Sequence, residues 1–143
     1  MKKIVISILV LSTIAIIIIY MNILEKQAQL KEIKFFNAEY ELYRNKEVLY
    51  GTDIVTIINK AINSNEKNGI PKNEKGYYID NENNSIKVDV YMSINKSTYE
   101  METISKVGIT NFIANFNLTQ FKCSGIEYHK NGRISKIHIE EKE

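Results

Sequence analysis

The sequence predicts an α+β protein: a transmembrane helix extended into an amphipathic helix, a second helix, and an antiparallel sheet of about five strands with one inserted helix. Three observations lead to this prediction. Residues 4–24 are uncharged and mostly apolar, residues 25–67 carry apolar side chains at helical spacing, and residues 86–94 carry them at strand spacing. The expected order is αα-βββ-α-ββ, with the helices on one face of the sheet.

The apolar segment, IVISILVLSTIAIIIIYMNIL, covers residues 4–24 without a charge. A helix of this length spans roughly 30 Å, the thickness of the hydrocarbon core of a bilayer. A cleaved signal peptide has an apolar region of only about 7–15 residues that ends at small residues, and this segment does not. No cysteine directly follows it, as a lipoprotein would require. We therefore predict an uncleaved signal anchor at 1–24, with residues 4–24 in membrane lipid.

The charges beside this segment predict its orientation. Lys2, Lys3 and the terminal amine precede it, and a short basic head before a long apolar run is typical of a cytoplasmic N-terminus. Lysines also follow the segment, which weakens the asymmetry. We expect residues 25–143 to form one extracytoplasmic domain, held at the cell membrane by a single pass.

The remaining composition excludes several classes of function. Without Lys2 and Lys3 the chain has 17 basic and 17 acidic residues, whereas a nucleic-acid-binding domain normally carries a basic excess on one face. We therefore expect no nucleic-acid partner. No glycine-rich phosphate loop, HExxH, CxxC or GxSxG motif is present. We expect no cofactor.

Two helices are predicted before the sheet. The first continues from the apolar segment and places Ile33, Phe36, Tyr40 and Tyr43 on one stripe, which packs on the domain or on a partner. Gly51 interrupts the helical pattern, and Thr52 or Asp53 can cap the second helix. The apolar face of that second helix comprises Ile54, Ile57, Ile58, Ala61 and Ile62. The short link predicts an antiparallel pair.

The strands follow a polar loop around Pro71. Residues 77–79 predict a short strand. The segment SIKVDVYMSI, residues 85–94, alternates strictly, as a sheet exposed on one side requires. Its predicted inward face comprises Ile86, Val88, Val90, Met92 and Ile94.

Residues 97–104, STYEMETI, are ambiguous. Ser97 and Glu100 match a capping box, which favours a helix, but the alternation after a turn favours a strand. We favour the strand, which places Glu100 and Glu102 on a solvated face. A helix is then predicted over residues 105–116, weakened by Gly108.

The chain ends in a predicted hairpin. Asn131-Gly132 suits a two-residue type I′ turn. This turn predicts the pairs His129–Ile134, Tyr128–Ser135, Glu127–Lys136, Ile126–Ile137 and Gly125–His138. The core face then comprises Ile126, Tyr128, Ile137 and Ile139. His129 and His138 lie on the other face, roughly 13 Å apart along the strand, which is too far to share one metal ion.

Cys123, Glu127 and His138 form the nearest set of candidate ligands. In a regular strand Cys123 approaches His138 diagonally, whereas a bulge at Ser124-Gly125 turns Cys123 toward the core. Both arrangements of Cys123 remain open, but because cysteine commonly behaves as a small buried hydrophobe, we favour a hairpin without a metal or thiol site. We expect no catalytic, cofactor-binding or metal-binding residue, and no enzyme activity.

Three stretches carry a resemblance: FNAEYELYRNKEVLYGTDIVTIINKAINSNEKN, STYEMETI and FKCSGIEYHKNGRISKIHIEE. Together they resemble small single-pass membrane-anchored proteins of AT-rich Gram-positive bacteria, which have no assigned activity. In architecture alone, a long N-terminal helix leading into a sheet is similar to type IV pilin-like proteins. MKKIVISILVLS lacks the glycine before the apolar run, and the glutamate within it, that pilin processing uses.

Three functions remain open at this point. The first is a non-enzymatic interaction or assembly domain of a cell-envelope machine, such as a pilus, secretion or conjugation apparatus, with a protein partner there. The second is a pilin-like or pseudopilin-like structural subunit. The third is a metal- or thiol-dependent enzyme or receptor that uses the C-terminal hairpin.

Overall fold

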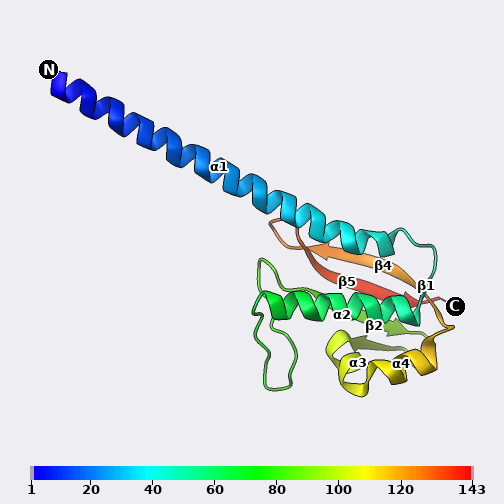
Figure 1. Cartoon of the computed structure of the whole chain (residues 1–143). Coiled ribbons are helices and arrows are strands. Elements are labelled where there is room, and N and C mark those ends of the chain that lie inside the picture. Colours follow the sequence, from blue (N-terminus) through cyan, green and yellow to red (C-terminus); the bar gives the residue numbers. More distant parts are fainter. Residues whose placement is uncertain (1, 143) are drawn as a thin grey trace. The chain divides into compact units, whose positions relative to one another are not determined.

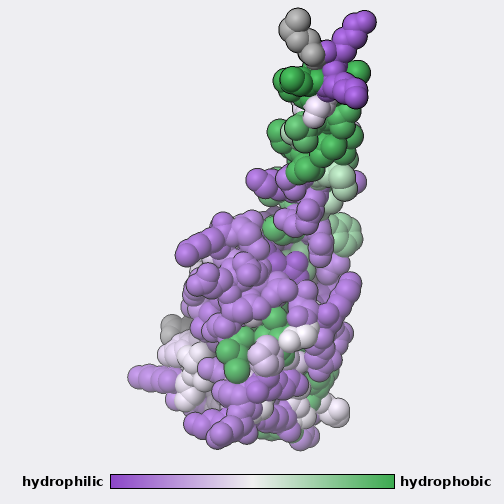
Figure 2. Space-filling model, turned by 90° about the vertical axis from the view of Figure 1, so that its left-hand side faces the viewer, coloured by the Kyte–Doolittle hydropathy of each residue, from purple (hydrophilic) through white to green (hydrophobic). Residues whose placement is uncertain are grey.

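The computed structural model describes residues 2–142, and the chain divides into two compact units, Met1–Phe35 and Phe36–Glu143. Helix α1, Lys2–Arg44, begins in the first unit, and its residues from Phe36 onward belong to the second unit. In its N-terminal part α1 is long and apolar enough to cross a membrane. Figure 2 shows hydrophobic surface in this part, whereas most of the visible surface of the second unit is hydrophilic.

The second unit has the predicted α+β fold, with helices on one face of a five-stranded sheet (Figure 1). The strand order is β1-β4-β5-β2-β3. After α1 the elements are β1 (Leu49–Tyr50), α2 (Gly51–Lys67), β2 (Lys87–Met92), β3 (Ser97–Glu100), α3 (Met101–Val107), α4 (Ile109–Phe116), β4 (Gln120–Tyr128) and β5 (Ile134–Glu141).

The sheet is mixed, so the prediction of a purely antiparallel sheet was wrong in one pair. Strand β5 runs parallel to β2, with Val88 beside Ile137 and Val90 beside Ile139. The cause is the connection through α3 and α4, which carries the chain from the β3 edge to β1 at the opposite edge. Strand β4 begins there, and β5 returns between β4 and β2.

The fifth strand is not the predicted one. In residues 77–79 only Tyr78 makes a ladder contact, an isolated bridge to Lys72 outside the sheet. The Tyr78 amide instead donates to the Glu102 carboxylate at 3.0 Å. The two-residue strand β1 takes the fifth place by pairing with β4.

The helix predicted over residues 105–116 is two helices, and it starts earlier. Ser97–Glu100 is a strand as favoured, but α3 begins directly after it at Met101. Gly108 has φ 104°, a left-handed conformation that only glycine adopts easily, and it separates α3 from α4. The ambiguous segment is therefore a strand in its first half and a helix in its second.

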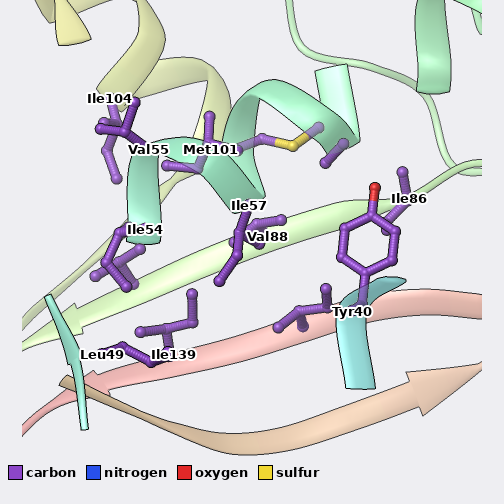
Figure 3. Close-up of a cluster of buried hydrophobic side chains, with 14 of the residues drawn as sticks. Tyr40, Leu49, Ile54, Val55, Ile57, Ile86, Val88, Met101, Ile104 and Ile139 are labelled. Carbon is purple, nitrogen blue, oxygen red and sulfur yellow. The ribbon is translucent and has the colours of Figure 1, made fainter. Parts of the chain in front are cut away.

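The core lies between the sheet and its helices (Figure 3), where side chains from α1, α2, β2 and β5 meet. Three of the four residues in the predicted α1 stripe pack on the domain: Tyr40 is buried, and Phe36 and Tyr43 are half-buried against the core. Every residue of the inward face predicted for residues 85–94 is buried except Ile94. Ile94 is 83% exposed because β2 ends at Met92 and the chain turns.

Candidate functional site

The tip of the β4–β5 hairpin differs from the predicted type I′ turn. Gly132 N donates to His129 O at 2.9 Å, and His129 N donates to Arg133 O at 2.8 Å, which closes a three-residue loop. Gly132 has φ 86°, whereas Asn131 keeps a negative φ. The Asn131 side chain accepts a hydrogen bond from Arg133 N at 3.0 Å and donates one to Asn83 O at 2.9 Å. The contact to Asn83 lies outside the hairpin, so the Asn-Gly turn preference does not include it.

The register departs from the predicted one only near the two ends of the hairpin, and the predicted pair of His129 with Ile134 is absent. The predicted pairs Glu127–Lys136, Ile126–Ile137 and Gly125–His138 are present. A shift beside Glu127 pairs Tyr128 with Ile134 instead of Ser135, and Tyr128 is 44% exposed instead of buried. A second shift, between Cys123 and Gly125, places Cys123 opposite Ile139.

The second shift is a bulge at Ser124-Gly125, one of the two arrangements considered from the sequence, and it separates Cys123 from His138. Cys123 is half-buried against the core and pairs with the buried Ile139, whereas His138 lies on the outer face. Burial raises the pKa of the Cys123 thiol. A raised pKa lowers the fraction of thiolate, which is the nucleophilic and metal-binding form. The structure thus does not bring these two candidate residues together.

His138 is instead held between two carboxylates. Its Nδ1 lies 2.8 Å from Asp89 Oδ1 on β2, and its Nε2 lies 2.6 Å from Glu127 Oε1 on β4. Lys136 Nζ lies 2.9 Å from the other oxygen of Asp89. The four side chains connect the three adjacent strands β4, β5 and β2 across the outer face.

The geometry of this cluster suits structural support. The two imidazole nitrogens face different carboxylates, so the ligand atoms do not converge on one point. Among residues 2–142, no group of three or more His, Cys, Asp or Glu side chains is arranged to hold a metal ion. The cluster therefore acts as an ionic link between strands.

The pKa of His138 makes this link depend on pH. Burial lowers the His138 pKa, but the hydrogen bonds to Glu127 and Asp89 outweigh it, so the pKa lies above its usual value. A raised native pKa stabilises the fold fully below the unfolded-state pKa of about 6.5. This contribution disappears as the pH rises through the native-state pKa.

We expect His138→Gln to lower the free energy of unfolding more at about pH 5.5 than at about pH 9. Urea unfolding of the full chain in mild detergent, followed by circular dichroism, measures the difference. In a background with Asp89→Asn and Glu127→Gln the pH dependence of the substitution should largely vanish. An effect of His138→Gln that is equal at both pH values would contradict the ionic link.

His129 has a different, structural role. Its Nε2 lies 2.7 Å from the carbonyl oxygen of Ser85, so the ring donates to the loop that precedes β2. Within that loop the Asn81 Oδ1 accepts from the backbone amides of Asn83, Asn84 and Ser85. The hairpin tip and Asn81 together hold the loop, which accounts for the polar residues at the tip.

A buried ion pair between β2 and α3 could not be recognised from the sequence pattern. Glu102, expected on a solvated strand face, is 4% exposed, because the chain becomes helical at Met101. Its Oε1 accepts from Lys87 Nζ at 3.2 Å, while within residues 2–142 its Oε2 has no hydrogen-bond partner. The ion pair links β2 to α3, and the Tyr78 amide, which donates to the same Oε1 at 3.0 Å, fastens the loop around Tyr78 onto α3.

An uncharged groove lies between the β2–β3 turn and the two helices α3 and α4. It is lined by Met92, Ile94, Asn95, Tyr99, Thr103, Ile104, Val107, Asn111, Phe112, Asn115 and Phe116. Ile94 and Val107 at its rim are 83% and 66% exposed. Exposed apolar side chains gathered around a groove are typical of a binding surface.

No family model, curated protein or solved structure matches this chain. In the described part of the chain, the charged clusters around His138 and Glu102 link one backbone element to another. The groove beside α3 and α4 combines an apolar floor with exposed apolar side chains. The groove is therefore the candidate functional site.

Proposed function

We propose that this chain is a single-pass membrane protein whose extracytoplasmic domain binds a protein partner in the cell envelope, without enzyme activity. The observation that carries the proposal is α1, which joins an apolar segment suited to a membrane to the first helix of a folded domain. Such a connection holds the domain beside the membrane, within reach of other envelope proteins. A pilus, secretion or conjugation apparatus is the kind of assembly that uses such a domain.

The groove supports a polypeptide partner. None of its lining residues is charged, so it offers no cation to a phosphate or a nucleic acid. Its apolar floor suits apolar side chains, and the carboxamides of Asn95, Asn111 and Asn115 supply polar groups beside them. The expected occupant is a segment of a membrane-associated protein that presents apolar side chains.

Photo-crosslinking in living cells tests this proposal. A photoreactive phenylalanine analogue at Val107, on the rim of the groove, is expected to yield one dominant product with another envelope protein. The matched control is Leu118, which is apolar and 83% exposed but does not line the groove. The product should also form from Ile94 and not from Leu118. The same products from all three positions, or none from the groove, would refute the proposed binding surface.

A further inference from the structure

Helix α1 carries a second apolar stripe that the core does not use. Phe35 and Leu42 are 72% and 67% exposed, although Phe36 and Tyr40 next to them pack on the domain. Successive residues of an α-helix point about 100° apart, so Phe35 and Phe36 lie on different faces. The exposed stripe is therefore distinct from the face that holds α1 to the sheet.

The spacing of this stripe is seven residues. Ile14, Met21, Ala28, Phe35 and Leu42 follow one another at this interval, which returns to nearly the same face of a helix. The intermediate positions of the same heptad are Ile17, Leu24, Lys31 and Ala38. This is the arrangement of a helix–helix seam, with one polar position at Lys31. We name the part from Leu24 to Leu42 the heptad stripe.

The flanks of the heptad stripe carry one pair of opposite charges that a second helix could join. Glu25, Glu32 and Glu39 follow the seam on one side, whereas the other side carries Gln27, Lys34 and Glu41, with Lys34 as its one cation. In a parallel pair of helices these flanks face each other across the seam. Lys34 of one copy then lies opposite Glu39 of the second. Glu39 remains available for this contact, because its own ion pair with Lys60 is long, at 3.7 Å, and its side chain is 43% exposed.

We propose that two copies of this chain associate in parallel through the heptad stripe. The inference rests on the proposed anchoring of α1 in a membrane, because insertion with one orientation makes two copies parallel and aligns their registers. The alanines at positions 28 and 38 allow close approach, while Phe35 and Leu42 fill the seam. The second copy covers apolar side chains that are exposed in the single chain.

Cysteine crosslinking of the full chain in its native membrane tests this seam. In a Cys123→Ser background, single cysteines replace Ala28, Phe35 or Leu42, and oxidation is followed on non-reducing gels. Strong disulfide-linked dimers are expected at these three positions. The matched control is Leu30, which is 62% exposed and apolar but lies off the stripe. Equal crosslinking at Leu30 and Phe35, or none at the three stripe positions, would overturn the dimer.

Charge reversal adds a second, milder test. Lys34→Glu should reduce the crosslinked fraction from Leu42→Cys about five- to tenfold, because two attractive contacts become repulsive. Adding Glu39→Lys to the same chain should restore it. A loss that Glu39→Lys does not restore would contradict the pairing of Lys34 with Glu39.

Alkaline carbonate extraction of the same membranes tests the membrane anchoring separately from the dimer. If the chain stays in the membrane pellet but the crosslinks show no seven-residue pattern, the dimer is wrong and the anchoring stands. If the chain is extracted, the anchoring itself is wrong and the parallel dimer falls with it. Retention together with the seven-residue pattern supports both.

Discussion

Replacing Asn65 with alanine is expected to lower the free energy of unfolding by about 2–6 kcal/mol, although the substitution removes only a carboxamide from a helix. Asn65 lies on α2 and is fully buried. Its Nδ2 donates to Ile86 O at 2.8 Å, and its Oδ1 accepts from Ile86 N at 2.9 Å. Alanine leaves both backbone groups of Ile86 buried without these partners, at about 1–3 kcal/mol for each.

Thermal and urea unfolding of the full chain in mild detergent measure this loss. The matched control is Asn63→Ala, an exposed asparagine on the same helix, which should change stability by less than about 0.5 kcal/mol. Asn65→Asp should be at least as damaging as alanine, because it keeps the acceptor but replaces the donor with a buried charge. Equal stability of Asn65→Ala and Asn63→Ala would show that the Ile86 contacts contribute little.

The α2 face shows what periodicity predicts well. Of the five predicted residues, Ile54, Ile57, Ile58 and Ala61 are fully buried, and Ile62 is partly buried against the core. Asn65 lies on the same face, four residues beyond Ala61. A search for apolar residues at helical spacing does not include it, because asparagine is polar. A polar residue at a core-facing position is a signal of a buried hydrogen bond, and it was present in the sequence.

Asn37 makes the same kind of contact at the hairpin. Its Nδ2 donates to Gly132 O at 2.8 Å, and its Oδ1 accepts from Ile134 N at 2.9 Å. The partners are separated from Asn37 by most of the chain, so no local rule predicts them. Such distant contacts, with those of Asn131 and His129, set the loop where the local Asn-Gly rule predicted a type I′ turn.

The parallel pairing of β2 and β5 also depends on parts of the chain that are far apart in the sequence. The alternation in β2 and β5 predicted which of their side chains face inward. That facing is the same whether the two strands pair parallel or antiparallel. Which strands become neighbours depends on the path through α3, α4 and β4, and local periodicity carries no information on it. Strand β1 has only two residues, too few for any period to show.

The candidate groove was missed for a related reason. Ile94 ends an alternating run, so the pattern placed it in the core, but the strand ends at Met92 and the side chain is exposed. The groove then joins this turn to Val107 and Phe116 of two helices. By contrast, the separation of Cys123 from His138 followed from a bulge at Ser124-Gly125 that the sequence did indicate.

Gly51→Ala is expected to destabilise the domain by roughly 2–3 kcal/mol, the upper part of the range for overpacking. Gly51 is the buried first residue of α2, where alanine would normally favour the helix over glycine by about 1 kcal/mol. A Cβ at this position would lie 2.5 Å from the carbonyl oxygen of Phe116 and 3.2 Å from Asn117 N. Both are backbone atoms of the α4 C-terminus, so no side-chain rotation relieves the contact.

The sign of the effect distinguishes close packing from helix propensity. Thr52→Ala, at the exposed next position of α2, should be neutral or slightly stabilising, because alanine is the better helix former. If Gly51 serves only to begin the helix, both substitutions should stabilise the domain in urea unfolding. If it allows α2 and α4 to approach, Gly51→Ala alone should destabilise it, and the Phe116 region should lose amide protection in hydrogen exchange. The second outcome is expected, since the contact distance leaves no room for a methyl group.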